Sequence, residues 1–253
     1  MRQRVLVTAG ASGIGREIVR AFAANGAAVF TCDIDSVALA LLQQESGDVI
    51  TDVCDLSKRA DIEAMVGRAA EGLGGLDVLV NNAGIPGPVA PVEELNPDDW
   101  ESVIQINLHA TFDVTRLAIP YLKRSRAGVI LVMSSVAGRC GYTNRSSYAT
   151  SKWGLIGFTK TLARELGAHN IRVNAILPGI VEGPRLDRFL QDRARRSGKT
   201  IEEEGELAQS GQSLRRFVDP KDIAALTLFL ASDAAKSISG QTLSIDNDTQ
   251  STP

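Results

Sequence analysis

Two side chains in the stretch SSYATSKW (146–153), Tyr148 and Lys152, have the types and the spacing that proton transfer requires. On a helix, residues four apart lie one above the other on the same face. An ammonium group beside a phenol favours the phenolate and lowers the pKa of the Tyr from its ordinary value of about 10. The pair therefore predicts a Tyr that exchanges a proton near neutral pH. The same spacing also occurs on exposed helices that do no chemistry, so the rest of the chain has to decide.

A glycine-rich turn near the N-terminus has the features of a phosphate-binding site. An apolar run leads into TAGASGIGREI (8–18), which places Gly10, Gly13 and Gly15 ahead of a helical pattern. Glycines there permit a tight turn and let the backbone approach a pyrophosphate, while the helix N-terminus supplies amide donors and a positive dipole end. Ser12 adds a hydroxyl donor. The context, between the first strand and the first helix, favours a dinucleotide site over an ordinary turn.

The second predicted strand leads into Asp33, which lies about twenty residues beyond the glycines. An acid at this point accepts hydrogen bonds from the adenosine ribose hydroxyls and repels a 2′-phosphate. Neither neighbour, Cys32 nor Ile34, is a cation that would offset this repulsion. The residue therefore predicts NAD rather than NADP. The alternative is a loop or helix-cap role, for which Asp35 is the better candidate.

The composition disfavours several classes of function. The 253 residues are 44% hydrophobic and 23% charged, with a formal net charge of −3, so no strong field favours nucleic acid or an anionic membrane. We find no signal-peptide pattern and no apolar run of about 18 residues, and expect no membrane span. The three cysteines form neither a disulfide framework nor a metal-ligand pattern, which fits a reducing cytoplasm. Neither of the two histidines has other ligand types clustered near it, so no metal is expected.

Short apolar runs rich in β-branched residues alternate with amphipathic stretches along the chain. Such runs are expected of strands that are buried on both faces of a sheet. Repeated strand–helix–strand units predict a single α/β domain, 1–253, with a doubly wound parallel sheet of about seven strands and helices on both faces. The predicted strands are 4–8, 27–32, 47–51, 76–81, 128–133, 171–177 and 241–245, and the predicted helices include 14–25, 58–72, 98–124, 147–167 and 219–232.

One long segment, 182–216, interrupts this alternation with polar residues of mixed charge. An insertion at this point of the chain frequently forms a lid or a binding loop. We therefore predict a substrate lid that is mobile without ligand and closes over the site. The alternative is a solvated helical excursion.

Seven motifs occur in an order that resembles the short-chain dehydrogenase/reductase family. They are TAGASGIG (8–15), DL (55–56), NNAG (81–84), IN (106–107), SSVAG (134–138), the Tyr148/Lys152 pair and PG (178–179). No motif is decisive alone, but their order and spacing are specific, and the match covers nearly the whole chain. The resemblance implies a Rossmann-like fold and hydride transfer between a nicotinamide cofactor and a secondary alcohol or ketone.

The resemblance also implies four catalytic residues. Tyr148 would be the general acid/base, and Lys152 would lower its pKa and hold the nicotinamide ribose. Ser135 would hydrogen-bond the substrate oxygen; it lies thirteen positions before Tyr148, the usual separation in the family, which favours it over Ser134. Asn107 would hold a water that links Lys152 to solvent.

The family's cofactor contacts map onto a longer set of residues, and four residues depart from its pattern. The implied contacts are Gly10, Ser12, Gly13, Ile14, Gly15, Asp33, Asp55, Leu56, Asn82, Ala83, Gly84, Tyr148, Lys152, Pro178, Gly179 and Val181. Ala9 replaces the first glycine, so either its methyl weakens cofactor binding or Gly10 takes over the flexibility. Gly183 stands where a Thr is frequent, and Asn247 with Asp248 replaces a glycine pair.

A second set of residues is expected to line the mouth of the substrate pocket. It consists of Arg139, Cys140, Tyr142, Arg145 and Arg185. Two or three Arg near a hydroxyl site favour a polar, carboxylated substrate such as a hydroxy acid or a sugar acid. The alternative for each Arg is exposure to solvent, or an ion pair with Glu182, Asp187 or another subunit.

Three functions are compatible with these motifs. The first is an NAD-dependent dehydrogenase of a small polar secondary alcohol (hydroxy acid, sugar or sugar acid). The second is a 3-oxoacyl-thioester (ACP-type) reductase, against which Asp33 argues because such reductases usually take NADPH. The third is a non-catalytic NAD-binding regulator, against which the four catalytic-type residues argue. We also expect a homodimer or homotetramer, since the long helices 98–124 and 147–167 carry apolar residues beyond what one sheet needs.

Overall fold

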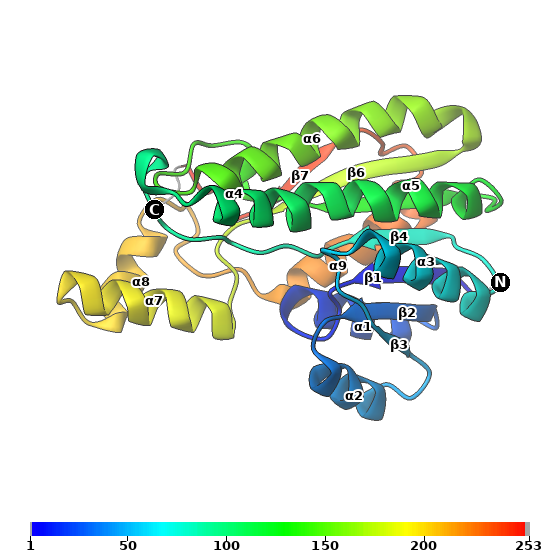
Figure 1. The fold of residues 1–253 in the computed structure, drawn as a ribbon, viewed down its shortest axis with the longest axis horizontal. Helices are drawn as coiled ribbons and strands as arrows, with labels where there is room; N and C mark the ends of the chain where they lie inside the picture. Colours follow the sequence, from blue (N-terminus) through cyan, green and yellow to red (C-terminus); the bar gives the residue numbers. More distant parts are fainter. Residues whose placement is uncertain (1, 251–253) are drawn as a thin grey trace.

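The protein, described at residues 2–250 in a computed structural model, is built on one seven-stranded parallel sheet (Figure 1). The strand order is β3-β2-β1-β4-β5-β6-β7, so the chain reverses its direction of travel across the sheet between β1 and β4. The strands are β1 (Arg4–Thr8), β2 (Ala28–Asp33), β3 (Ile50–Val53), β4 (Val78–Asn81), β5 (Gly128–Met133), β6 (Ile171–Pro178) and β7 (Thr242–Ile245).

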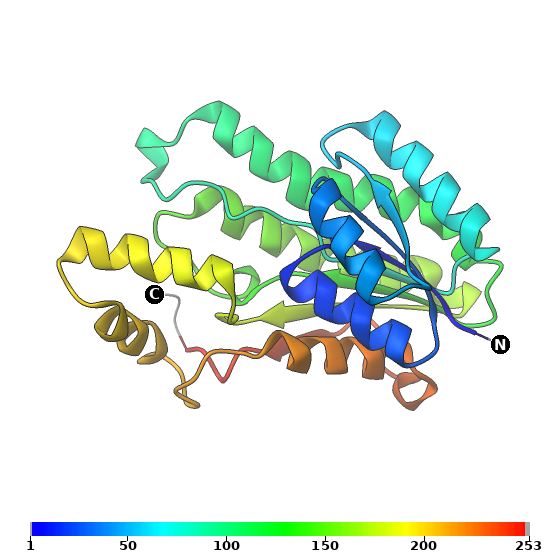
Figure 2. The same cartoon turned by 90° about the horizontal axis from the view of Figure 1, so that it is seen from below.

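Helices cover both faces of this sheet (Figures 1 and 2). One apolar core lies between the sheet and α1 (Gly13–Ala24), α2 (Ser36–Glu45) and α9 (Pro220–Ala231). The other lies between the sheet and α3 (Arg59–Leu73), α5 (Ala110–Leu122) and α6 (Ser146–Leu166). The predicted fold class is therefore confirmed. No helix of residues 2–250 is both long and apolar enough to cross a lipid bilayer.

The remaining short helices are 3₁₀ turns at η1 (Val92–Glu94), η3 (Val136–Gly138), η4 (Gly167–His169) and η5 (Asp233–Ala235). Most predicted strand bounds agree with the structure to within two residues. The third strand begins at Ile50, three residues later than predicted, because a turn closed by the Val49 amide on the Ser46 carbonyl precedes it. Asp35 accepts hydrogen bonds from the amides of Val37 and Ala38 and caps α2, which confirms it as the helix-cap residue.

The predicted helix 98–124 is helical over nearly its whole length, but its hydrogen-bond pattern changes within it. The chain forms α4 (Pro97–Ile104), a π-helical turn η2 (Gln105–His109) and then α5. A π-turn adds one residue to a helical turn and frees backbone groups from the regular ladder, and such turns occur frequently at functional sites. Here it contains Asn107.

The polar segment 182–216 forms two helices, α7 (Pro184–Ser197) and α8 (Ile201–Gln209), which project from one end of the molecule (Figure 1). Their small core contains Leu186, Leu190 and Ala208. The buried Glu204 carboxylate accepts hydrogen bonds from Arg193 Nε and Ser197 Oγ, each at 2.7 Å, and so joins the two helices. The segment thus has internal structure, in addition to the polar surface read from its sequence.

Candidate active site

The predicted site residues meet at the carboxyl edge of the sheet, where the parallel strands all end. Ligands bind at this edge in open α/β sheets, beside the point where the strand order reverses. The glycine turn follows β1, Asp33 ends β2 and Asn82 follows β4. Ser135 follows β5 and Gly179 follows β6. The topology alone therefore brings together residues that are far apart in the sequence.

Tyr148 and Lys152 lie on the first turns of α6 and face one another. The Lys152 Nζ lies 5.6 Å from the centroid of the Tyr148 ring and donates a hydrogen bond of 2.9 Å to the Met133 carbonyl at the end of β5. Lys152 is 3% exposed, and this burial lowers its pKa, an effect that the Tyr148 phenol opposes. The ammonium group is thus held inside the protein beside the phenol.

The electrostatic surroundings of Tyr148 favour its phenolate. Burial raises the pKa of Tyr148, but the charge of Lys152 lowers it, followed by the charge of Arg185, the Ser135 hydroxyl and the charge of Arg145. The net effect is a pKa below the ordinary value for a Tyr. The charged groups with the largest influence on the phenol are therefore all cations.

The two adjacent serines after β5 have different surroundings. The Ser135 hydroxyl interacts with the Tyr148 phenol and also accepts a hydrogen bond of 3.2 Å from the Ala137 amide. The Ser134 hydroxyl instead donates to the Lys152 carbonyl at 2.9 Å, inside α6. This geometry favours Ser135 as the residue that reaches the substrate oxygen, in agreement with its spacing in the sequence.

Asn107 is fully buried, and its side chain is committed to protein partners. Its Oδ1 accepts a hydrogen bond from the Ile85 amide at 2.8 Å, while Nδ2 donates to the Ile85 carbonyl and to Ser151 Oγ, each at 3.0 Å. The side chain therefore connects η2 to the loop after β4 and to α6. These side-chain contacts were not foreseen from the sequence. That Asn107 also holds a water stays a prediction.

The glycine-rich turn differs from the sequence expectation at its first two positions. Ala9 adopts a left-handed conformation, with φ of 53°, which accounts for the glycine that the family prefers there. Gly10 does not take over this conformation. A methyl group on Gly10 would lie 2.0 Å from Thr31 Oγ1, so its lack of a side chain is needed for close packing against β2.

Polar contacts from β4 hold the glycine turn in place. The Asn82 side-chain amide donates to the carbonyls of Thr8 and Ala9, each at 3.0 Å, and Thr8 Oγ1 accepts from the Asn82 and Ala83 amides. A methyl group on Gly15 would lie 2.1 Å from the Ala9 carbonyl oxygen. The role of the Thr8 hydroxyl was not foreseen, and the only sequence signal for it is its place at the start of the TAGASGIG motif.

The helix that follows the turn begins without a side-chain cap. Ser12 is exposed and precedes α1, and its hydroxyl makes no capping bond to the helix amides. Gly13, the first residue of α1, has φ of 53°, a conformation that favours glycine. These residues leave the first amides of α1 available to an anion, as a pyrophosphate site requires.

The Asp33 carboxylate lies beside this turn. Its Oδ2 accepts a hydrogen bond of 3.1 Å from the Ala11 amide, and its Oδ1 accepts one of 3.2 Å from Asp35. In the turn after the neighbouring strand β3, the hydroxyl and amide of Ser57 lower the pKa of Asp55. Both carboxylates thus lie at or just after the carboxyl ends of neighbouring strands, β2 and β3, on the side where the adenosine is expected to bind.

The segment after β6 closes the other side of the site. Gly179 packs against the backbone of Asp246, where a methyl group would lie 2.8 Å from the Cα atom. Val181 forms a parallel bridge with Val218. In this bridge the Val218 amide donates to the Ile180 carbonyl and the Val218 carbonyl accepts from the Glu182 amide, so the bridge itself does not use the backbone amide of Val181. Gly183 has φ of 130°, which a Thr would adopt only with strain.

The structure separates the predicted substrate residues into two groups. Arg139 donates to the Asp246 carboxylate at 2.6 Å and to the Thr249 carbonyl at 2.7 Å, so it supports the turn after β7, and its contact with substrate stays a prediction. Cys140, its neighbour, is part-buried, and its amide donates to the Val136 carbonyl at 3.1 Å. Tyr142, Arg145 and Arg185, in contrast, lie within electrostatic reach of Tyr148.

Arg145 and Arg185 have different surroundings. Arg145 Nη1 donates to the Pro86 and Gly87 carbonyls, and its guanidinium lies 5.7 Å from the centroid of the Tyr142 ring. Burial lowers the pKa of Arg145. Arg185 is exposed at the start of α7 and has neither a hydrogen bond nor an ion pair within residues 2–250. Arg185 is therefore the cation that is available to a ligand.

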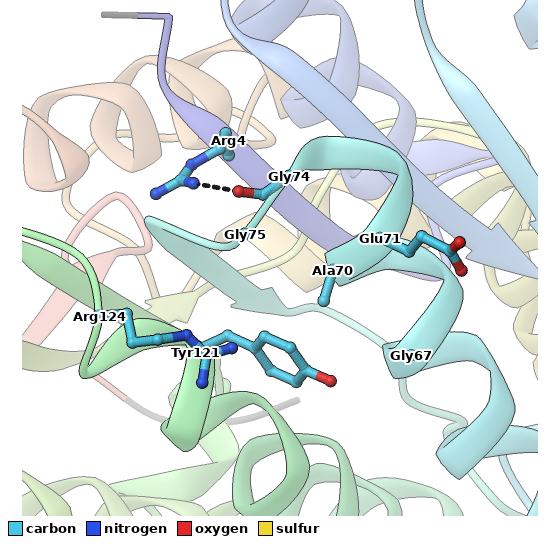
Figure 3. A pocket seen from close by; sticks show the side chains of 8 residues that line it. All are labelled: Arg4, Gly67, Ala70, Glu71, Gly74, Gly75, Tyr121 and Arg124. Atoms are coloured by element: carbon cyan, nitrogen blue, oxygen red, sulfur yellow. Dashed lines mark hydrogen bonds between the residues drawn. The ribbon is translucent and has the colours of Figure 1, made fainter.

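A pocket of about 620 Å³ lies at the opposite end of the sheet and takes no part in this site (Figure 3). It is lined by residues of α3, β1 and the end of α5, among them Arg4 and Tyr121. The Arg4 guanidinium there is already bonded to Asp77 and to the Gly74 carbonyl. The pocket is therefore separate from the carboxyl edge, where the predicted site residues lie.

Known proteins resemble the chain over nearly its whole length. A sequence model of the family described as short chain dehydrogenase matches residues 3–194. The chain is 40% identical over 245 residues to 3-oxoacyl-(acyl-carrier-protein) reductase FabG of Thermotoga maritima, and 37% identical over 246 residues to D-beta-hydroxybutyrate dehydrogenase of Cupriavidus necator, with 95% of each chain covered in both cases. The crystal structure of a variant of actinorhodin polyketide ketoreductase with NADPH superposes with a TM-score of 0.91 at 31% identity, covering 97% of this chain and 96% of the other.

Proposed function

The chain belongs to the short chain dehydrogenase family, and from this premise we propose that it is an NAD-dependent dehydrogenase of a small, anionic secondary alcohol. Family membership makes it an oxidoreductase that interconverts secondary alcohols and ketones with a nicotinamide cofactor. The observation that carries the proposal is the contact of Tyr148 with the buried Lys152 and with Ser135, at the carboxyl edge of the sheet.

The residues at this edge fit a nicotinamide dinucleotide. The turn at Gly15 has no room for a side chain, and the Ser12 hydroxyl makes no capping bond to the first amides of α1. A methyl group on Gly84 would lie only 3.2 Å from Lys152 Nζ, so the loop after β4 packs closely against the ammonium group that is expected to hold the ribose. When bound, the nicotinamide supplies the hydride chemistry.

The protein residues would then handle the proton and the developing charge. In the direction of oxidation, the Tyr148 phenolate takes the proton of the substrate hydroxyl, and in reduction the phenol returns it. The Ser135 hydroxyl hydrogen-bonds the same substrate oxygen and stabilises negative charge on it. Lys152 keeps the phenolate accessible by its charge and stays near the cofactor ribose. A positioned acid/base of this kind contributes about 10²–10⁴ in rate.

The preference for NAD is supported by charges near Asp33. Its carboxylate lies where the ribose hydroxyls are expected and would repel a 2′-phosphate. The two Arg of α1 do not offset this charge, because Arg16 and Arg20 both pair with Glu45. The structural neighbour holds NADPH, so the preference depends on Asp33 of this chain and not on the shared fold.

Replacing Asp33 with Ala is expected to lower kcat/KM for NAD by about 10–100-fold, since hydrogen bonds to a charged group contribute about 1.5–3 kcal/mol. The same change should leave kcat/KM for NADP equal or higher, because the repulsion is removed. Asp35→Ala is the matched control: it removes the cap of α2, at a stability cost of about 1 kcal/mol, and should not alter the preference. A wild-type protein that prefers NADP in kcat/KM would show that Asp33 has been assigned the wrong role.

The choice of an anionic substrate is supported by the cations around Tyr148. Lys152, Arg185 and Arg145 are the charged groups that act most strongly on the phenol, and Arg185 has no partner within residues 2–250. A carboxylate on the substrate would compensate this charge and pair with the planar guanidinium in a bidentate manner. Hydroxy acids and sugar acids combine such a group with a secondary hydroxyl.

Replacing Arg185 with Ala is expected to raise KM for a carboxylated substrate by about 10–100-fold, the range for a lost charge-assisted hydrogen bond. KM for an uncharged secondary alcohol should change by less than about twofold, because no such bond is made. Arg188→Ala removes a charge from the same helix, where its Nε donates to the Pro184 carbonyl, and is the control.

Hydrogen exchange of 182–216, with and without NAD and substrate, tests the accompanying proposal that α7 and α8 close over the site. Equal protection in both states would reject closure.

The second candidate is a 3-oxoacyl-thioester reductase, favoured by the 40% identity to the FabG protein. A panel of hydroxy acids, sugar acids and 3-oxoacyl thioesters, each tested with NAD(H) and NADP(H) by absorbance of the reduced cofactor, separates the two candidates. Turnover of the thioester alone, with NADPH, would reject the first. No turnover of any compound, with the cofactor bound, would favour a regulator.

Self-association is proposed from apolar residues at the surface of α5 and α6. Phe112 is 46% exposed and meets Phe158 edge-on, with ring centroids 6.4 Å apart, and Trp153 on α6 is 51% exposed. Light scattering should report a multiple of the 27.0-kDa protomer mass. Phe112→Glu should dissociate the assembly, whereas Val37→Glu, at an exposed position of α2, should leave it intact. A wild-type mass of one protomer at micromolar concentration would refute the assembly.

A further inference from the structure

Ser151 lies between Tyr148 and Lys152 on α6 and has no exposed surface. Its hydroxyl donates a hydrogen bond of 2.7 Å to the Tyr148 carbonyl, three residues earlier in the helix. The same oxygen accepts a hydrogen bond of 3.0 Å from Asn107 Nδ2. The hydroxyl is therefore both donor and acceptor, and it joins the turn that carries Tyr148 and Lys152 to η2.

The contact continues beyond Asn107 to the loop after β4. The Asn107 side chain accepts from the Ile85 amide and donates to the Ile85 carbonyl, so this loop and η2 are joined by two hydrogen bonds. A methyl group on the preceding Gly84 would lie 3.2 Å from Lys152 Nζ and 3.3 Å from Asn107 Oδ1. The ammonium group, the Asn107 amide and this loop thus pack around one point.

We propose that Ser151 is a positioning residue, which fixes the Tyr148–Lys152 turn of α6 against η2 and so keeps the two groups at the separation that proton transfer needs. The proposal rests on the proposed function, because it assigns Ser151 a part in the same reaction. The Ser151 hydroxyl bonds to the Tyr148 carbonyl and to the Asn107 amide, and not to the phenol oxygen or the ammonium nitrogen. It acts through Asn107 and through the helix backbone.

The physical basis is a buried donor that would lose its partner. Without the Ser151 hydroxyl, one N–H of Asn107 has no acceptor from α6, and a buried unsatisfied donor is unfavourable. The amide would turn toward another acceptor, and α6 would lose this hydrogen bond to η2, so that only packing such as that of Leu108 against Gly154 would remain between them. Because the attraction between two charges falls with their separation, any movement of Lys152 away from Tyr148 weakens the effect of its charge on the phenol.

The other groups that face this pair would stay in place. Tyr148 is also influenced by Arg185 from α7, by Arg145 from the loop before α6, by the Ser135 hydroxyl and by Tyr142, while Lys152 is influenced by Tyr148 and Arg185. None of these groups is hydrogen-bonded to Ser151. A change in the titration of Tyr148 on loss of the Ser151 hydroxyl would therefore report movement of the Tyr148–Lys152 turn.

The test is a spectroscopic titration of Tyr148 in Ser151→Ala, read from ultraviolet difference absorbance of tyrosinate in the full-length protein. The chain has three Tyr, so subtraction of the same titration in Tyr148→Phe isolates the signal of Tyr148. We expect the pKa of Tyr148 to rise by about half a unit in Ser151→Ala, because the effect of Lys152 weakens. We also expect kcat to fall about tenfold, with KM for the cofactor changed by less than about twofold.

Thr227→Val is the matched control, since the fully buried Thr227 hydroxyl also donates to a helix carbonyl, that of Ile223 in α9. It should lower the melting temperature without moving the titration of Tyr148. Ser151→Cys retains the shape of the side chain with a weaker donor and should give an intermediate shift, and it replaces Ser151→Ala if that variant does not fold. An unchanged titration in Ser151→Ala, or an equal shift in Thr227→Val, would overturn the proposal. The titration needs no substrate, so it gives an answer even if the proposed dehydrogenase activity is not found.

Discussion

Replacing Tyr148 with Phe is expected to lower kcat by about 10²–10⁴-fold, the full contribution of a positioned acid/base. The ring would still pack at the start of α6, but it would have no proton to exchange. Cofactor binding should change by less than about twofold, because the Lys152 ammonium and the glycine turn are retained. Steady-state kinetics with the active substrate, together with a fluorescence titration of the reduced cofactor, measures both quantities.

Tyr121→Phe is the control for this change. Tyr121 lies near the end of α5, beside the pocket at the opposite end of the sheet, and its replacement should leave kcat unchanged (Figure 3).

In the wild type, kcat for oxidation should rise with pH as Tyr148 deprotonates. The rise should be centred below the ordinary Tyr value of about 10, because the pKa of Tyr148 is lowered. Reduction should show the opposite trend, since it requires the protonated phenol. Substantial turnover in Tyr148→Phe would reject the mechanism.

The second large effect is expected for Lys152→Ala, which should lower kcat by about 10²-fold or more and also weaken cofactor binding by about tenfold. The two losses arise together because the ammonium group acts on the phenol and lies beside the loop that is expected to hold the ribose. The alkaline rise of oxidation should move to higher pH, because the charge that most lowers the pKa of Tyr148 is gone.

Lys160→Ala gives the comparison for Lys152. Lys160 lies on the same helix and is exposed, and its ammonium group donates to the Gly240 carbonyl at 3.3 Å. Its replacement should leave kcat and the pH dependence unchanged. If Lys152→Ala lost cofactor binding while the pH profile stayed in place, the ammonium group would be a cofactor ligand without influence on the phenol.

The sheet was predictable because its strands are buried on both faces and so are continuously apolar. The β5 run GVILVM (128–133) was placed without error, since each of its residues is buried. The third strand was placed less well, because β3 lies at the edge of the sheet, where exposed Ile50 and Val53 make the pattern indistinct. The π-turn η2 was missed because the sequence before it and the sequence after it each keep the ordinary helical periodicity.

The site was predictable where a motif fixes both the residue and the end of a strand, as for Ser135, Tyr148 and Lys152. It was less predictable where a side chain has a choice of partners. Arg139 and Arg185 look alike in the sequence, yet Arg139 pairs with Asp246, from the turn after β7, whereas Arg185 has no ion pair within residues 2–250. Such a pairing depends on the tertiary fold, over 107 residues of separation. The link between Ser151 and Asn107 was missed for the same reason.

Because the strand order reverses between β1 and β4, the residues expected to bind the cofactor and those expected to bind the substrate come largely from different parts of the gene. The groups expected to recognise the adenosine and the phosphates come from residues before the end of β3 and its following turn, while Ser135, Tyr148 and Arg185 come from the chain after β5. Mutations in one part can therefore change the cofactor without changing the substrate, and the reverse also holds. A lineage that keeps the first part while the second diverges would produce proteins of one fold with different substrates. The reductase and the hydroxybutyrate dehydrogenase are 40% and 37% identical to this chain, and their names give different substrates, as such divergence would produce.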